Sequence, residues 1–206
     1  MKNVFDRYYI KYDQWYEDHK AVFQSEVAAV KKALRREGRG LEVGVGTGRF
    51  AQALEIGQGI DPSEKMLQIA RQRGIETECG FGERLPYENG RFDFVLVVTT
   101  ICFLDSPAQT LREIRRVLKK RGRIVIGFIE QNSFLGKLYK KRKSGLYVKA
   151  RFLTVDRLTR MLAEAGYRQF AYYQTIFQNP ENIKVAEKPK QGYGQGSFVV
   201  IGAEKV

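Results

Sequence analysis

Two kinds of apolar pattern alternate along this 206-residue chain. Short, nearly continuous apolar runs, such as residues 94–98, are typical of central strands that are covered on both faces of a sheet. Apolar positions three and four residues apart, as in residues 22–36, are typical of helices. The short runs predict strands at residues 40–45, 57–60, 75–79, 92–99 and 123–129.

The second half of the chain adds two helices and then a change of pattern. Ser106 can cap a helix whose first turn suits Pro107, and Gly122 ends it. A late helix is predicted at residues 154–166, followed by strands at 168–178 and 197–205. Because no helix separates these two strands, we expect them to be antiparallel. The connector, residues 179–196, has prolines and glycines among charged residues, which indicates a surface loop.

A glycine-rich turn follows the first predicted strand. Its glycines are Gly44, Gly46 and Gly48, and Asp61 closes the next strand. Glycines let a ligand approach the backbone, and an acidic residue at about this offset can accept hydrogen bonds from ribose hydroxyls. Glu42 would repel a pyrophosphate but suits a cofactor with an ammonium group and a sulfonium. The turn therefore predicts a nucleoside cofactor other than NAD.

The segment from Glu42 to Gly48 has the pattern E/D-x-G-x-G-x-G, the first motif of the class I S-adenosylmethionine-dependent methyltransferases. The similarity extends, in that family's order, through residues 59–67, 80–87, 92–97, 107–122 and 154–166. The chain thus resembles this family, and within it the branch that acts on small molecules. The resemblance implies an α/β, Rossmann-like sheet of seven strands in the order 3-2-1-4-5-7-6, with strand 7 antiparallel and helices on both faces.

The resemblance also implies a binding site for S-adenosylmethionine. Its glycines would line the methionine part, Glu42 would fix the turn and receive the ammonium group through water, and Asp61 would hold the ribose. Phe81 stands where many relatives carry an aspartate, so it either meets the adenine or packs in the core. The implied cofactor residues are Glu42, Gly44, Gly46, Gly48, Asp61, Pro62, Met66, Phe81, Gly82, Glu83, Val98 and Thr99.

The N-terminal segment, residues 1–37, is unusually aromatic between positions 5 and 16. These rings either form a helical lid that holds an organic substrate or simply pack the helix onto the sheet. As a lid, the segment would contact the substrate through Tyr8, Tyr12, Trp15 and Tyr16, together with Thr100 after the fourth strand. His19, Tyr12 and Glu130 are candidates for a base. Methyl transfer, however, depends on alignment more than on a fixed base.

Length and composition favour one domain over residues 1–206, with residues 38–206 as the core behind the lid. No apolar run could span a membrane, and the first residues lack the apolar core of a signal peptide, so we expect a cytoplasmic protein without a membrane partner. Cys79 and Cys102 lack metal-ligand spacing, which predicts two core thiols and no metal. The oligomeric state stays open.

The net charge of +13 is concentrated in an insertion, residues 133–151. The insertion contains Lys137, Lys140, Lys141, Arg142, Lys143, Lys149 and Arg151, and a second basic cluster contains Arg35, Arg36 and Arg39. The insertion is either a solvated loop or a site for an anionic substrate or RNA. Three functions stay open: methyl transfer to a small molecule such as an amine, methyl transfer to RNA or protein, and cofactor binding without catalysis.

Overall fold

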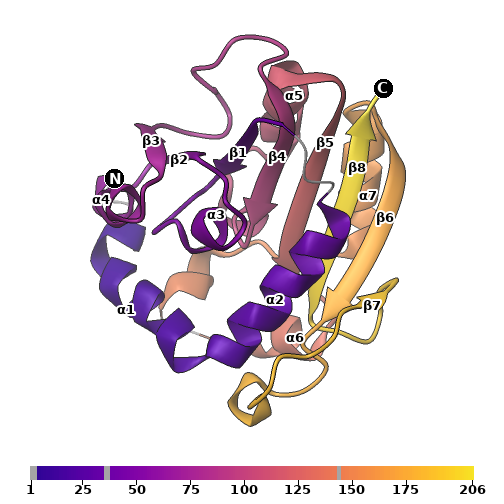
Figure 1. Cartoon of the computed structure of the whole chain (residues 1–206). Helices are drawn as coiled ribbons and strands as arrows, with labels where there is room; N and C mark the ends of the chain where they lie inside the picture. The colour runs from indigo at the N-terminus through magenta and orange to yellow at the C-terminus, as the bar shows by residue number, and fades with distance from the viewer. Residues whose placement is uncertain (1–3, 35–37, 143–144) are drawn as a thin grey trace.

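The computed structural model describes residues 4–34, 38–142 and 145–206. Its helices alternate with strands for most of the chain, as the apolar patterns predict (Figure 1). The α-helices are α1 (Val4–Asp18), α2 (Lys20–Ala33), α3 (Arg49–Ala53), α4 (Glu64–Gln72), α5 (Pro107–Val117), α6 (Phe134–Lys140) and α7 (Val155–Glu164). Short 3-10 helices follow β4, α6 and β6: η1 (Ile101–Phe103), η2 (Leu146–Lys149) and η3 (Pro180–Asn182).

The described strands form one mixed sheet. They are β1 (Gly40–Val43), β2 (Gln58–Asp61), β3 (Glu76–Cys79), β4 (Phe92–Val98), β5 (Leu118–Ile129), β6 (Tyr167–Thr175), β7 (Lys190–Gln191) and β8 (Phe198–Lys205). Their order is β3-β2-β1-β4-β5-β8-β6-β7, with β8 antiparallel to both β5 and β6. The predicted Rossmann-like order is confirmed, with β8 in the place of strand 7. The extra strand, β7, has only two residues and is too short to leave a sequence pattern.

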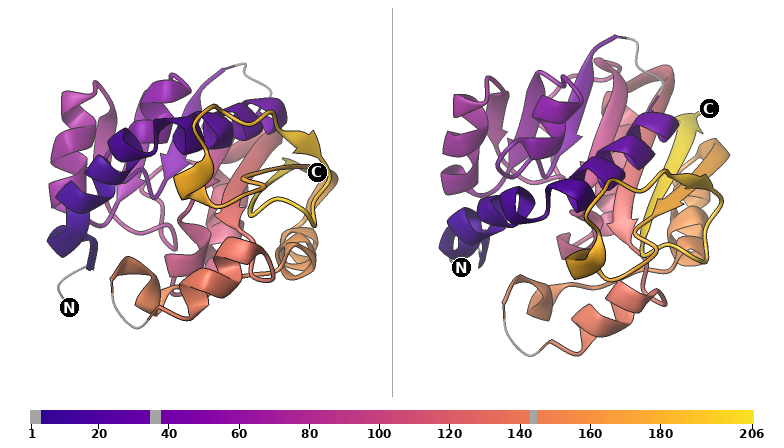
Figure 2. Two further views of the ribbon diagram at one scale, coloured as in Figure 1. Left: turned by 90° about the horizontal axis from the view of Figure 1, so that it is seen from below. Right: turned by 60° about the horizontal axis from the view of Figure 1, so that its bottom comes forward.

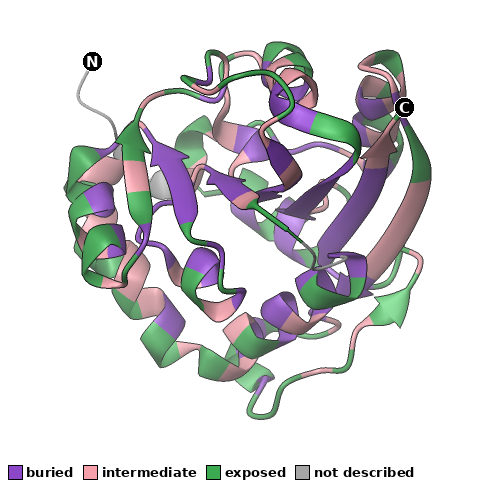
Figure 3. Cartoon of the chain, turned by 45° about the horizontal axis from the view of Figure 1, so that its top comes forward, coloured by how far each residue is buried: buried purple, intermediate pink, exposed green. Residues whose placement is uncertain are grey.

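Alternation along β4 divides the core between the two faces of the sheet. Phe94, Leu96 and Val98 pack into one apolar cluster with buried residues of α2, α3 and α4. Val95 and Val97 point the other way, into a cluster with α5 and α7. Figure 3 shows the central strands buried between these layers. Both faces are therefore covered, which explains the continuous apolar run in the sequence.

Several predicted boundaries and placements were wrong. Helix α5 ends at Val117 and β5 begins at Leu118, because Leu118 is buried and pairs with Phe92 of β4, so Gly122 lies inside a strand. The side chain of Ser106 makes no capping hydrogen bond. Cys79 is exposed, since β3 is at the sheet edge, whereas Cys102 is buried as predicted.

The N-terminal segment and the basic insertion are both helical where they are described. Residues 4–33 form α1 and α2, which meet at His19, while Arg35 and Arg36 lie outside the described residues. The insertion forms α6 and η2, and Lys143 lies outside the described residues. The connector 179–196 is only partly irregular, because it contains η3 and β7. Among the described helices, none has the length and apolar character needed to cross a bilayer.

Candidate active site

A cavity of about 900 Å³ lies at the carboxyl ends of β1, β2 and β4. This end of an open α/β sheet is where such folds bind ligands. One wall consists of the glycine turn and Asp61, and the opposite wall of α6 and η2. Helices α1 and α2 contribute further lining residues. Figure 2 shows α1 and α2 on one side of this region and the segment containing α6 and η2 on the other.

The glycine turn brings bare backbone to the cavity. Gly44, Gly46 and Gly48 all have positive φ, at 73°, 52° and 81°, so a side chain would be strained at each. A Cβ on Gly44 would lie 2.2 Å from Cγ2 of Thr100, which closes that position to any side chain. At Gly46 the nearest atom to an added Cβ is Sδ of Met66, 3.4 Å away. An added Cβ would thus make only ordinary van der Waals contacts, and Gly46 lines the cavity.

Asp61 is buried beside this turn. Its Oδ2 accepts a hydrogen bond from the backbone N–H of Gly46 at 3.0 Å, and its Oδ1 accepts one from Ser63 at 2.9 Å. Burial raises the pKa of Asp61 to about 6, the two backbone donors oppose this rise, and the nearby charge of Asp6 adds to it. The carboxylate can accept further hydrogen bonds, because each oxygen has two lone pairs.

We expect this pKa to make cofactor binding depend on pH. We expect ribose hydroxyls to donate to the ionised form of Asp61. Affinity for S-adenosylhomocysteine will then fall as the pH drops below 6, approaching about a tenfold loss per pH unit. Calorimetric titrations between pH 5 and pH 8 measure the effect. The Asp61→Asn variant keeps one acceptor oxygen but does not titrate, and a wild-type slope retained in that variant would refute the assignment.

The predicted adenine contacts also reach the cavity. Pro62, Met66, Phe81, Gly82 and Glu83 all line it. Phe81 is 61% exposed and is therefore not a core residue. The Oε1 atom of Glu83 accepts a hydrogen bond from the backbone N–H of Ser106 at 3.1 Å, so this carboxylate also fastens the start of α5.

Four predicted residues do not line the cavity. Glu42 is buried, and it accepts a hydrogen bond from the backbone of Ala51 in α3. Gly48 faces Ala70, where a Cβ would lie 3.1 Å from the Ala70 Cβ, and Val98 packs in the core. Glu130 accepts a hydrogen bond from the backbone N–H of Asn132 at 2.7 Å. These four residues therefore lie outside the lining of the cavity.

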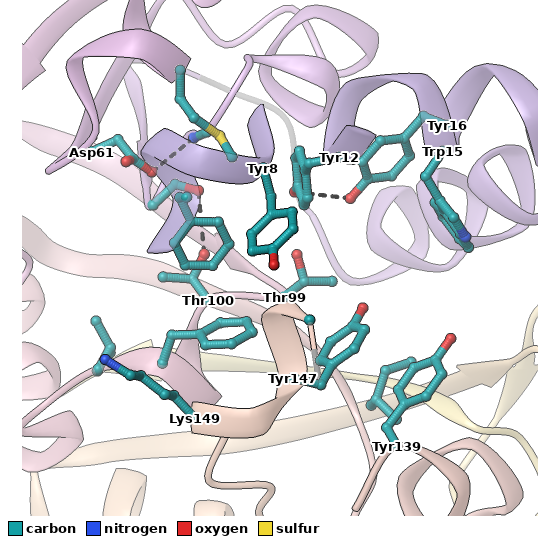
Figure 4. A pocket seen from close by; sticks show the side chains of 18 of the residues that line it. Tyr8, Tyr12, Trp15, Tyr16, Asp61, Thr99, Thr100, Tyr139, Tyr147 and Lys149 are labelled. Atoms are coloured by element: carbon teal, nitrogen blue, oxygen red, sulfur yellow. Dashed lines mark hydrogen bonds between the residues drawn. The ribbon is translucent and has the colours of Figure 1, made fainter. Parts of the chain in front are cut away.

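The aromatic segment of α1 faces the same cavity as the glycine turn (Figure 4). The hydroxyls of Tyr12 and Tyr16 lie 3.0 Å apart, and the Tyr12 ring approaches Gly46. Burial raises the pKa of Tyr12 to about 12, although the hydroxyls of Tyr16 and Thr99 oppose the rise. Thr99 has a positive φ of 51°, which is strained for a β-branched residue. Tyr8, Trp15 and Thr100 also line the cavity.

Comparison with known proteins identifies the family. A family model described as a methyltransferase domain matches residues 41–126. A crystal structure from Thermotoga maritima, described as a SAM-dependent methyltransferase and possible histamine N-methyltransferase, is 44% identical, covers 100% of both chains and has a TM-score of 0.97. The chain belongs to the class I S-adenosylmethionine-dependent methyltransferases.

Two further relatives show how far the similarity extends. An uncharacterised protein of Methanocaldococcus jannaschii is 44% identical over 99% of this methyltransferase and 100% of its own length. A demethylmenaquinone methyltransferase of Thermotoga maritima is 31% identical over 62% of this chain and 69% of its own. The cofactor of the methyltransferase is S-adenosylmethionine. The open space at Gly46 and the buried carboxylate of Asp61 fit this molecule.

Partly buried ion pairs fasten helix α1 to the cofactor side of the methyltransferase. Asp13 accepts hydrogen bonds from Nε and Nη2 of Arg49 at 2.9 and 2.6 Å, and from Arg73 at 2.9 Å. Burial alone would raise the pKa of Asp13, but these guanidinium groups bring it well below its usual value. Asp6 also accepts a hydrogen bond from the Ser63 hydroxyl at 2.6 Å. The aromatic face of α1 is thereby held over the glycine turn.

Replacement of Asp13 by alanine should loosen α1. The change leaves two largely buried guanidinium groups without their partner, which we expect to cost about 2 kcal/mol of unfolding free energy. Limited proteolysis will then cut within α1 earlier than in the wild type. Asp18→Ala is the matched control, because Asp18 is exposed on the same helix and bonds only to Gln14 among the described side chains. Equal cleavage of the two variants would refute the role of Asp13.

His19 lines the cavity, but both of its ring nitrogens have partners. Nδ1 is 2.9 Å from the carbonyl oxygen of Trp15, and Nε2 is 3.4 Å from a carboxylate oxygen of Glu181. The ring stacks on Trp15 with centroids 4.6 Å apart. This arrangement holds the His19 ring against Trp15, and neither ring nitrogen is free to contact a methyl acceptor. A role for His19 as a base stays a prediction.

Much of the wall formed by α6 and η2 was not predicted from the sequence. Tyr139 and Tyr147 stack with centroids 4.4 Å apart, and Glu26 of α2 lies close to both rings. The tyrosines that interleave with the basic insertion were a signal for this wall, whereas Glu26 had no distinguishing neighbours in the sequence. The further lining residues on this side include Val22, Ile129, Leu135, Leu138, Arg142, Lys149, Asn179, Pro180 and Glu181.

Proposed function

We propose that this methyltransferase transfers a methyl group to a small organic acceptor, an amine, held in the aromatic half of the cavity. The observation that carries the proposal is the continuity of the cavity. The glycine turn and Asp61 share it with aromatic side chains from α1, α6 and η2. Its volume of about 900 Å³ is large for a small-molecule site, so it has room for a cofactor and a small acceptor together.

The chemistry needs alignment and exclusion of water. When bound, S-adenosylmethionine supplies an electrophilic methyl group, and its sulfur leaves with the bonding electron pair. Tyr12 and Thr99 lie between the glycine turn and the aromatic wall, where they can orient the acceptor. An amine that is deprotonated before transfer needs no base, because the methylated product forms as an ammonium and then loses one proton to solvent. Aromatic faces attract such a group before it deprotonates.

RNA or protein is the alternative acceptor. It is supported by the exposed basic residues of α6 and its surroundings, among them Lys137, Lys140 and Lys141. The enclosed aromatic cavity supports a small acceptor instead. Binding of total RNA measured at 50 and 200 mM salt separates the two, because phosphate contacts weaken steeply with salt. We expect weak RNA binding that does not compete with S-adenosylhomocysteine.

A transfer assay tests the proposal directly. The protein is incubated with methyl-tritiated S-adenosylmethionine and, separately, with a pool of small amines, a pool of phenols and total RNA. We expect label in the amine pool and background levels in the other two. The Asp61→Ala variant is the control, because any tritium that it transfers does not depend on the cofactor site. Label that enters only RNA or the protein itself would contradict the proposal.

A further inference from the structure

One buried carboxylate in the cavity has no role in cofactor binding. Glu26, in the middle of α2, is 4% exposed and lines the cavity. Its Oε2 atom has no hydrogen-bond partner within residues 4–34, 38–142 and 145–206. A buried polar atom without a partner costs free energy, and a buried charge without a partner costs more. Glu26 therefore lowers the stability of the folded protein unless a ligand completes its hydrogen bonds.

The surroundings of Glu26 are aromatic. Its charge raises the pKa values of Tyr16, Tyr139 and Tyr147, with burial as the larger cause for all three. All three rings line the same cavity as Glu26. Tyr139 stacks on Tyr147, and the Arg142 guanidinium lies 4.6 Å from the Tyr139 ring centroid. Burial raises the pKa of Glu26 to about 8, so the free carboxyl group is mostly protonated at pH 7.5 and would ionise on binding a cation. A buried carboxyl group with an unpartnered oxygen, in a cavity lined by aromatic rings, is suited to an organic cation.

Glu26 is separated from the glycine turn by two tyrosines. The Tyr12 ring lies next to Gly46, and the Tyr12 hydroxyl meets that of Tyr16 at 3.0 Å. Tyr16 in turn lies near Glu26. Figure 4 shows Asp61 and Tyr16 on opposite sides of Tyr12. A group bound to Glu26 is consequently distant from the atom that would receive the methyl group.

We infer that Glu26 anchors an ammonium group of the acceptor, at the end of the acceptor remote from its methylated atom. This inference rests on the proposed function and narrows the acceptor to molecules with two functional groups. One group is a protonated amine bound by the Glu26 carboxylate, beside the rings of Tyr16 and Tyr147. The other is an uncharged nucleophile near Tyr12 and Thr99. The anchoring nitrogen cannot itself be methylated, because its lone pair holds a proton.

The test compares two probes of similar shape, 2-phenylethylamine and 2-phenylethanol. Both are titrated by calorimetry into protein saturated with S-adenosylhomocysteine, at pH 7.5. We expect the wild type to bind the amine at least tenfold more tightly than the alcohol, and Glu26→Gln to remove this preference. Glu164→Gln is the matched control, because it removes one exposed carboxylate from α7 and should leave the preference unchanged.

Three results would overturn the inference. These are a wild type with no preference for the amine, a Glu26→Gln variant that keeps the preference, and an equal loss in Glu164→Gln. Affinity for S-adenosylhomocysteine and the thermal midpoint, measured on the same samples, verify that Glu26→Gln is folded. The proposed function fails separately. If the preference for the amine depends on Glu26 but no pool becomes radioactive in the transfer assay, Glu26 still binds the ammonium group and only the proposed methyl transfer is refuted.

Discussion

Replacing Asp61 by alanine will weaken the binding of S-adenosylhomocysteine by at least about 100-fold. A carboxylate that accepts two hydrogen bonds from ribose contributes about 1.5–3 kcal/mol for each. The variant also leaves the backbone N–H groups of Gly46 and Ser63 without their acceptor, which disorders the turn that holds the methionine part. Isothermal titration calorimetry measures the loss, and Asp61→Asn should be intermediate because it keeps one acceptor oxygen.

Asp93→Ala is the matched control for this experiment. Asp93 also accepts a backbone hydrogen bond, from Arg39 at 2.8 Å, and it pairs with Lys119. It lies near the start of β4, at the end of the strand opposite to the cavity. We expect Asp93→Ala to lower stability without changing cofactor affinity. If Asp61→Ala bound S-adenosylhomocysteine as tightly as Asp93→Ala, the ribose role of Asp61 would be refuted.

A methyl group at Gly46 will also prevent normal cofactor binding. The added Cβ would enter the space between Sδ of Met66, at 3.4 Å, and Cε1 of Tyr12, at 3.6 Å. Nothing in the protein blocks it there, so the fold survives with a strain of about 1–2 kcal/mol from the positive φ. We expect the cofactor, however, to occupy that space. We expect Gly46→Ala to reduce affinity for S-adenosylhomocysteine by at least about tenfold, as one displaced contact of about 1.4 kcal/mol implies.

Gly74→Ala separates backbone strain from this steric effect. Gly74 has a φ of 80°, and a Cβ there would have no atom within 4 Å. Both variants therefore carry the strain of a left-handed alanine, but only Gly46 faces the cavity. Thermal unfolding should shift by similar amounts in the two proteins, while affinity falls only in Gly46→Ala. Equal affinities would mean that the cofactor does not approach the turn at Gly46.

The cofactor half of the site could be predicted because its signals are local. The spacing from Gly44 to Asp61 follows from one strand, one turn and the next strand, so it is visible without the fold. The nearly continuous apolar run of β4 likewise predicted a central strand. The end of α5 was missed because Leu118 is held in β5 by Phe92, a contact between distant segments that no helical pattern reveals.

The acceptor half depends on contacts between distant parts of the chain. Glu26 meets Tyr139 and Tyr147 only after α2 and the insertion fold onto the same side of the sheet. Pro180 reaches the cavity from a connector that the sequence indicated as a surface loop. Such contacts leave no spacing in the sequence. The net charge drew attention to the cations of the insertion, and two of them, Arg142 and Lys149, line the cavity together with its tyrosines.

A crystal structure of the protein with S-adenosylhomocysteine tests the central claim most directly. We predict that the ribose hydroxyls bond to Asp61 and that the methionine part lies against Gly46. The sulfur should point toward Tyr12 and the aromatic half of the cavity. In that position a methyl group would point at an acceptor whose far end meets Glu26. A sulfur directed toward solvent, or an adenine bound among Tyr16, Tyr139 and Tyr147, would contradict it.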